Sequence, residues 1–391
     1  MTATTGGPRR PSLALLIAVT MTGTVALHVF IPALPAAAAE LRASPFAAQL
    51  TITLFLCGLA VGQLVYGPVS DRRGRRPVLI ASLVIYLGGA LAAVSATTME
   101  WLVGARVLQA LGACGALVIG RAMVRDVSTA DDAARMLALL IMCLTLTPSV
   151  APALGGALEA AFGWRGIFVA LAAVLVVLLV LVVATLPETH VPSAEAQGIR
   201  AGLSGYRRLA RSAQFRHYVI AGSCSGTSLY AFLAVAPFLY IDVLGRSPQA
   251  VGLYCVIVSV GMAAGAALVR IFVGRVEIRR GARVGNLICL GAALSLLALH
   301  VAVPLSVVVL TAPMVVYGVG VGIAGPNIVA GALNVDPEAA GSASGLFGFA
   351  QMMCGALFTL AVGVWHDGSA LPLAVVLVCA SAAAAVSLQR V

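Results

Sequence analysis

The sequence contains no lysine, and only 14 of its 391 residues are acidic. Without lysine there is no Gly-x-x-x-x-Gly-Lys-Ser/Thr phosphate loop, which excludes ATP-driven chemistry of that kind in this chain. The eight cysteines all lie in apolar runs and form no Cys-x-x-Cys pair, so they read as small buried side chains rather than disulfides or metal ligands. No catalytic triad, metal-ligand set or nucleotide-binding pattern is visible, and the sequence predicts a non-enzyme without a cofactor.

Polar surface is scarce as well. Hydrophobic residues make up 61% of the chain and charged residues 10%, with a mean hydropathy of +1.05. A soluble chain of this length needs far more polar surface to cover its core. The net charge of +10 comes entirely from arginine. Because most arginines form short clusters between apolar runs, the charge indicates membrane topology rather than nucleic-acid binding.

What the chain has in abundance is long apolar runs. Each membrane crossing needs about 20 apolar residues, and backbone groups in lipid must bond internally, so these runs predict helices. Six runs precede the longest polar stretch and six follow it. The sequence therefore predicts an all-α membrane protein of twelve transmembrane helices, with an N-terminal half at 1–187, a basic linker at 188–216 and a C-terminal half at 217–391. The runs fall at about 13–35, 47–70, 78–97, 99–123, 134–158, 166–187, 217–241, 249–273, 284–302, 305–331, 341–364 and 369–388.

Arginine placement predicts the orientation. With a cytoplasmic N-terminus and alternating crossings, nineteen arginines fall inside, and Arg42, Arg165 and Arg246 fall outside. This positive-inside bias predicts a multi-pass protein of a bacterial cytoplasmic membrane with both termini cytoplasmic.

The loop between the second and third runs, Gly67 to Pro77, resembles the loop motif Gly-x-x-x-Asp-Arg-x-Gly-Arg-Arg of the major facilitator superfamily. Gly74 permits a tight turn, and Asp71 can face an arginine or the positive N-terminus of span eleven. Arg121 is expected to pair with Asp71 or Asp126. The alternative is a solvated basic loop. The predicted gating residues are Gly67, Asp71, Arg72, Gly74, Arg75, Arg76, Arg121, Arg125 and Asp126.

Two further elements are similar to motifs of the same superfamily. Arg106 to Gly112 in span four looks like its Arg-x-x-Gln-Gly element. Span five is similar to its exporter-associated Gly-Pro-x-x-Gly-Gly motif through Pro148, Pro152, Gly155 and Gly156. Proline and small residues provide kinks and close helix contacts.

A narrower resemblance is to the Bcr/CflA drug-resistance group, which includes bicyclomycin and chloramphenicol/florfenicol exporters. It is carried by Phe30-Ile31-Pro32-Ala33-Leu34-Pro35, Gly62-Gln63-Leu64-Val65-Tyr66-Gly67-Pro68 and Val124-Arg125-Asp126-Val127. The resemblance implies two pseudo-symmetric six-helix halves that exchange a drug for protons by alternating access.

One position departs from that group. Where it usually carries an aspartate in span one this chain has His28, and none of the acidic residues lies in the middle of a span. Intramembrane ionisable groups suggest function, and histidine titrates near neutral pH. His28 is either a substrate and proton contact or a hydrogen-bonded packing residue, with the proton site elsewhere, such as Asp71.

Arg106 is predicted to line the cavity, because a guanidinium at that depth must face a cavity or a partner. No membrane carboxylate neutralises it, which disfavours lipophilic dications and favours neutral polar or anionic, amphenicol-like cargo. The remaining predicted substrate or proton residues are Phe30, Gln63, Tyr66, Tyr230 and Asn327.

The predicted partners are a small-molecule drug, protons and the lipid bilayer, with the chain acting as a monomer and binding no nucleic acid. Two alternatives are an importer or exchanger of an endogenous metabolite, and a receptor that binds ligand without flux. The proline-rich element of span five argues against the first, and the linker offers the second no recognisable signalling domain. A channel fits the two-half layout less well.

Overall fold

The computed structural model of the chain describes residues 12–127, 130–190, 206–272, 277–336, 340–365 and 367–391, and this part contains helices and no strand. Two of the elements are irregular, the 3₁₀ helix η1 and the π-helix η2. In chain order the helical elements are α1 Leu13–Val29, η1 Ile31–Ala33, α2 Leu34–Glu40, α3 Pro45–Arg73, α4 Arg75–Val94, α5 Met99–Asp126, α6 Ala130–Thr185, α8 Ala213–Thr227, α9 Leu229–Phe238, η2 Leu239–Val243, α10 Pro248–Phe272, α11 Ile278–Ala302, α12 Val307–Leu333, α13 Ala340–Val364 and α14 Leu371–Gln389.

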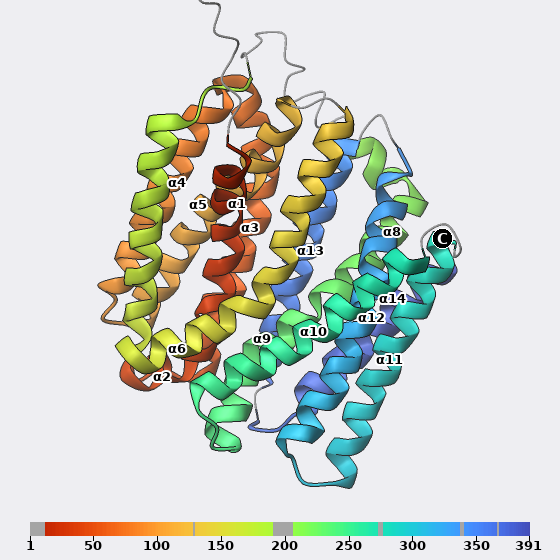
Figure 1. The fold of residues 1–391 in the computed structure, drawn as a ribbon. Coiled ribbons are helices and arrows are strands. Elements are labelled where there is room, and N and C mark those ends of the chain that lie inside the picture. The colour runs from red at the N-terminus through yellow and green to blue at the C-terminus, as the bar shows by residue number, and fades with distance from the viewer. Residues whose placement is uncertain (1–11, 128–129, 191–205, 273–276, 337–339, 366) are drawn as a thin grey trace, which may run out of the picture.

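The predicted all-α membrane fold is confirmed. Among the described residues, eleven helices are long and apolar enough to cross a membrane. The twelfth crossing is contained in α6, whose 56 residues span ~84 Å at 1.5 Å per residue, well beyond one bilayer. Gly163, with φ 69° and ψ 175°, interrupts the helix. At this point α6 turns and runs back, so it supplies both span five and span six (Figure 1).

The first and seventh crossings are interrupted helices rather than single runs. In the first, Pro32 and Pro35 stand at the starts of η1 and α2, positions that suit a residue without an N–H group. The seventh is bent at Ser228, whose hydroxyl forms a 2.6 Å hydrogen bond with the hydroxyl of Tyr317. Both crossings extend beyond their predicted ends, to Glu40 and Val243.

The helices form two groups, α1 to α6 on one side and α8 to α14 on the other (Figure 1). The groups meet mainly where α3 packs on α13 and where α6 packs on α10. A buried 2.7 Å hydrogen bond between the hydroxyls of Thr53 and Thr359 joins α3 to α13. The domain boundaries at 187 and 217 stay predictions, and residues 191–205 of the linker lie outside the described part.

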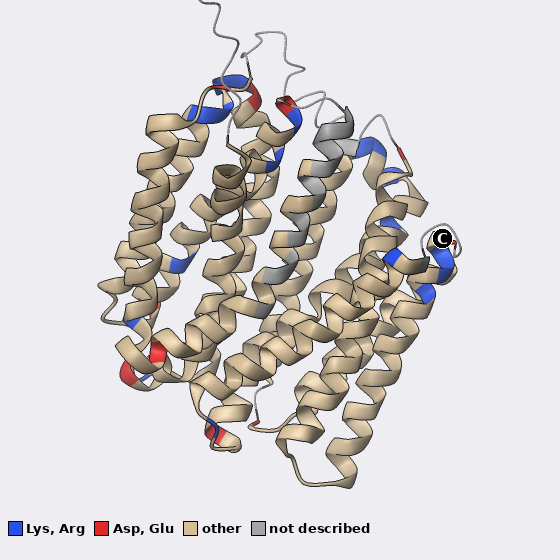
Figure 2. Cartoon of the chain, viewed as in Figure 1, with Lys and Arg blue, Asp and Glu red and all other residues tan. Residues whose placement is uncertain are grey.

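Charged residues gather at the two ends of the bundle and are sparse along its middle (Figure 2). We call the end with the α3–α4 loop the basic end. At the opposite end, Glu40 accepts a 2.7 Å hydrogen bond from Nε1 of Trp164 and pairs with Arg165. Arg165 also donates to the carbonyl oxygen of Ala96 at 2.7 Å. This cluster fastens α2 to the turn of α6.

Candidate functional site

The loop between α3 and α4 turns at Gly74, whose φ of 91° lies in the left-handed region. Any residue with a side chain is strained in that conformation, so glycine is the expected occupant. Glycine is also required for steric reasons, because a Cβ at Gly74 would lie 2.6 Å from Oε2 of Glu188. The glycine predicted to permit a tight turn therefore also lets a carboxylate approach the backbone.

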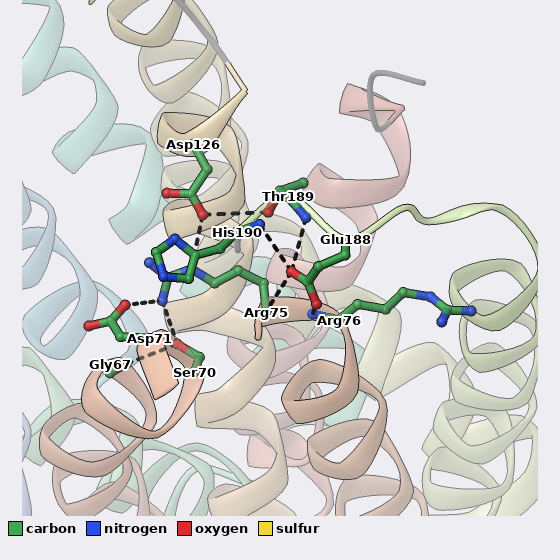
Figure 3. A network of polar contacts seen from close by, with 9 residues as sticks. All are labelled: Gly67, Ser70, Asp71, Arg75, Arg76, Asp126, Glu188, Thr189 and His190. Atoms are coloured by element: carbon green, nitrogen blue, oxygen red, sulfur yellow. Dashed lines mark hydrogen bonds and ion pairs between the residues drawn. The ribbon is translucent and has the colours of Figure 1, made fainter. Parts of the chain in front are cut away.

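Glu188, just after the end of α6, binds the first two residues of α4 through their backbone (Figure 3). Its Oε1 accepts from the N–H of Arg75 at 2.9 Å, and its Oε2 accepts from the N–H of Arg76 at 3.1 Å. These N–H groups lack partners inside the helix and carry its positive end, so the carboxylate caps α4. Glu188 was not among the predicted site residues, and its only local signal is an acid directly after an apolar run.

Arg75 is the centre of the cluster in Figure 3. Its guanidinium lies 2.5 Å from the carboxylate of Asp71 and 2.9 Å from that of Asp126, and it donates to the hydroxyl of Ser70 at 2.6 Å. The predicted pairing of Arg121 with either aspartate is not seen among the described residues, where its Nε donates to the carbonyl oxygen of Leu117, one turn back in α5. Arg75 reaches both aspartates because it begins α4 between the ends of α3 and α5.

The other predicted gating residues are less connected. Arg76 donates through Nη2 to a backbone carbonyl of α6 at 2.8 Å, and Arg72 and Arg125 are exposed. Gly67 accepts a 3.0 Å hydrogen bond from the hydroxyl of Ser70. The cluster thus fastens the basic ends of α3, α4, α5 and α6 together, as expected of a unit that moves as one body.

The described contact between α3 and α13 runs from Thr53 and Thr359 toward the basic end. Beyond the Thr53–Thr359 bond, Gln63 packs on Gly348, where a Cβ would lie 1.9 Å from Oε1 of Gln63. Two turns further on, Asp71 pairs within its own half, and no bond between it and α13 occurs in the described part of the chain. The predicted contact of Asp71 with the start of span eleven falls on residues 340 and 341, whose side chains lie outside the described part, so it stays a prediction.

Arg106 of α5 lies inside the first group of helices, fully buried. Its guanidinium carbon is 4.2 Å from the ring centroid of Phe55, 5.4 Å from that of Phe30 and 5.8 Å from that of Phe168. Cation–π attraction of this kind is strongest where water is absent. The rings come from spans one, two and six, so four segments of the chain enclose the cation that the sequence predicted to line a cavity.

The hydrogen bonds of Arg106 use only part of its capacity. Nη1 donates to the carbonyl oxygen of Ala26 at 3.0 Å and to the side-chain oxygen of Gln109. Nε and Nη2 of Arg106 and Nε2 of Gln109 are buried donors without a partner in the described structure. No acidic side chain of the described residues pairs with the guanidinium. An uncompensated buried cation is costly, and its presence indicates a function.

His28 of α1 faces the second group of helices. It is 3% exposed, and its ring centroid lies 6.2 Å from that of Tyr230 on α9. Nδ1 lies 2.8 Å from the carbonyl oxygen of Thr24. Because a carbonyl only accepts, Nδ1 carries the proton of the neutral ring. The fold therefore brings together two predicted site residues, His28 and Tyr230, from opposite halves.

Two other predicted residues lie apart from this pair. Tyr66 packs on α5, where a Cβ at Gly115 would lie 2.9 Å from its ring. Asn327 of α12 donates to the carbonyl oxygen of Ile323 at 2.8 Å and packs against Gly281 of α11. Asn327 is thus placed between two helices of the second group.

The small residues of span five lie where α6 meets its neighbours. A Cβ at Gly155 would lie 1.8 Å from a backbone carbonyl oxygen of α1, and one at Gly156 would lie 2.6 Å from a backbone oxygen of α10. The same contact seen from α10 is equally close, because a Cβ at Gly252 would lie 2.6 Å from the carbonyl oxygen of Pro152. Pro148, one turn away, is half-buried. The motif therefore permits backbone-to-backbone contact between the halves.

The described residues contain no group of three or more His, Cys, Asp or Glu side chains able to hold a metal. Two helical groups that meet along α3–α13 and α6–α10, with ionisable side chains buried near the junction, define a polytopic membrane transporter.

Comparison with known proteins gives the family. The model of the Major Facilitator Superfamily matches residues 13–359, and the chain belongs to that family. It is 28% identical over 382 residues to the uncharacterized MFS-type transporter YdgK of Bacillus subtilis (strain 168), covering 95% of this chain and 93% of that protein. It is 29% identical over 372 residues to a chloramphenicol resistance protein of Pseudomonas aeruginosa, covering 93% and 86%.

The fold is shared with a bacterial homologue of the human lysosomal transporter Spinster, solved in an inward-facing and unoccupied conformation. The two superpose with a TM-score of 0.74 at 14% identity, covering 96% of this chain and 93% of that one. The resemblance to drug-resistance transporters predicted from the motifs is confirmed by the relatives, and the superfamily fold by the structure.

Proposed function

We propose that the protein exports small-molecule drugs, amphenicol-like compounds among them, across the bacterial cytoplasmic membrane in exchange for protons. The observation that carries this proposal is Arg106, a buried cation with unused donors and no carboxylate partner among the described residues. The similarity to a chloramphenicol resistance protein supports the same class of cargo.

The charge of the site selects the cargo. A lipophilic cation that approaches Arg106 is repelled, and Coulomb energies are several-fold larger in the membrane interior than in water. A neutral compound with hydroxyl, carbonyl or nitro oxygens, or an anion, can accept from the free Nε and Nη2 donors. The phenylalanine rings beside the guanidinium favour an aromatic body on such a compound.

His28 and Tyr230 provide the coupling in this account. They face each other across the two halves, so any rocking of one half against the other changes their separation. Alternating access then opens His28 to one side of the membrane at a time, and its exposed ring can gain or lose a proton. Phe30 and Gln63, two further residues close to the junction, contact the cargo along the same path.

The cluster around Arg75 is the gate of the proposed cycle. It fastens the basic ends of the first half, which we place on the cytoplasmic side together with both termini. In this scheme Asp71 meets the start of α13 when the cytoplasmic side closes. One chain is the functional unit in this scheme, because the path lies between two halves of the same chain.

The proposal is tested by growth inhibition of a pump-deleted bacterial host that expresses the chain. The panel comprises chloramphenicol, florfenicol, bicyclomycin and lipophilic cations, with Arg106→Ala run alongside and membrane levels measured for both forms. We expect at least fourfold protection against amphenicols relative to the empty host, lost with Arg106→Ala and with a proton uncoupler.

Protection against lipophilic cations alone would overturn the assignment of cargo charge. No protection by a protein that is present in the membrane would instead favour the exchanger of an endogenous metabolite, and uptake of labelled metabolites would then be measured.

A further inference from the structure

A separate pocket of about 310 Å³ lies at the basic end of the second half. It is bordered by the first turns of α8 and α11 and the last turn of α12, away from both Arg75 and Arg106. Its volume is at the lower limit of small-molecule sites, which run from about 300 to 1,000 Å³. The lining residues are Gln214, Tyr218, Glu277, Ile278, Arg279, Gly331, Asn334 and Val335.

The N-terminus of α11 opens into this pocket without a side-chain cap. Glu277 stands at the N-cap position, but its side chain makes no capping bond. Its carbonyl oxygen accepts the first hydrogen bond of the helix, from the N–H of Gly281. Among the described residues no side chain caps the N–H groups at the start of this 25-residue helix, and they carry the positive end of its dipole. Arg279, in the first turn, adds a full positive charge to the same wall.

Tyr218 supplies a second, independent observation. The residue is only 3% exposed, lines the pocket, and has no hydrogen-bond partner for its hydroxyl in the described structure. Its ring fits because position 331 is glycine, where a Cβ would lie 2.4 Å from Cζ. The hydroxyl itself is not one of the fully buried unpaired atoms of the described residues, so it is accessible from the pocket and free to donate to a ligand there. Gln214 and Asn334 add amide donors to the same pocket.

The pocket also lies beside surface that faces lipid. Val284 and Leu287, in the turns of α11 that follow its pocket-lining first turn, are exposed apolar residues on a membrane-spanning helix. A site at this level is within reach of lipid headgroups, and basic pockets between helices are known to suit anionic ones.

We propose that this pocket binds a phosphate group, that of an anionic phospholipid. The N–H groups of α11, the guanidinium of Arg279 and the hydroxyl of Tyr218 are donors around one space, and a phosphate diester offers only acceptors and a negative charge. Glu277 is the one acidic group among the described lining residues, and it opposes the ligand. The proposal is independent of the drug that the protein exports.

The test is native mass spectrometry of the full-length, delipidated protein titrated with phosphatidylglycerol, phosphatidylcholine or inorganic phosphate. One phosphatidylglycerol is expected to bind at least tenfold more tightly than phosphatidylcholine, about 1.4 kcal/mol. Arg279→Gln and Tyr218→Phe should each weaken that binding, Glu277→Gln should strengthen it, and Arg211→Gln, an exposed arginine at the same end, should leave it unchanged.

Tyr218→Phe keeps the buried ring, so a folded variant is available even if another substitution destabilises the protein. Equal binding of the two lipids, or equal loss with Arg211→Gln and Arg279→Gln, would overturn the site. Binding of inorganic phosphate with the same variant dependence, and none of phosphatidylglycerol, would keep the phosphate chemistry and overturn the lipid as its source.

Discussion

At the scale of single residues, the cap of α4 depends on two positions that the sequence places far apart. Glu188 accepts from two backbone N–H groups, and 113 residues separate it from Arg75. We expect Glu188→Ala to lower the stability of the detergent-solubilised protein by about 1 kcal/mol, and Glu188→Gln, which keeps one acceptor, to lower it by less. Glu100→Gln, exposed on α5, is the control, and thermal unfolding is the measurement. Equal effects of all three changes would contradict the cap.

Gly74 gives a second residue-scale prediction, made with a double-mutant cycle. Gly74→Ala carries two penalties, about 1–2 kcal/mol for its positive φ and a further one for contact with the Glu188 carboxylate. In the Glu188→Ala background only the first remains. The cost of Gly74→Ala should therefore fall in that background, and purely additive costs would show that the two residues do not interact.

At the scale of helices, the contact between α6 and α10 depends on the absence of side chains. Gly252→Ala puts a Cβ 2.6 Å from the carbonyl oxygen of Pro152, which forces the helices apart. Because this contact joins the two halves, we expect at least a tenfold loss of transport with a smaller effect on folding. Gly291→Ala on α11, where a Cβ meets nothing within 4 Å, should be neutral. If both variants transport at the rate of the unmodified chain, the close contact between α6 and α10 is not needed for transport.

The helices themselves were predictable, while their contacts were not. Apolar runs and arginine clusters located the crossings, since each crossing must fit the bilayer. Gly163 lies in the predicted loop between the runs 134–158 and 166–187, whereas the break at Ser228 was missed because the apolar run 217–241 continues on both sides of it. Arg106 was found as an isolated charge, but the phenylalanines around it come from three other spans, which no local pattern relates. Asn327 was assigned to the cavity by its polarity, and the structure packs it against α11 instead.

At the scale of the whole molecule, the bond between Thr53 and Thr359 reports the relation of the halves. Their hydroxyl oxygens lie 2.7 Å apart, so cysteine sulfurs at the same two positions would lie near each other. In a background without the eight native cysteines, Thr53→Cys with Thr359→Cys should cross-link and lose transport until reduced. Thr53→Cys alone serves as the control. A cross-linked protein that still transports would argue against separation of α3 and α13 during the cycle.

The central claim is drug export driven by protons through Arg106 and His28, and the most direct measurement is uptake of labelled chloramphenicol into everted membrane vesicles with an imposed pH gradient. We predict uptake that an uncoupler abolishes, that Arg106→Ala and His28→Ala reduce to the level of vesicles without the protein, and that His300→Ala, at the end of α11, leaves intact. Full uncoupler-sensitive uptake in Arg106→Ala, or no uptake above empty vesicles by the unmodified chain, would contradict the account.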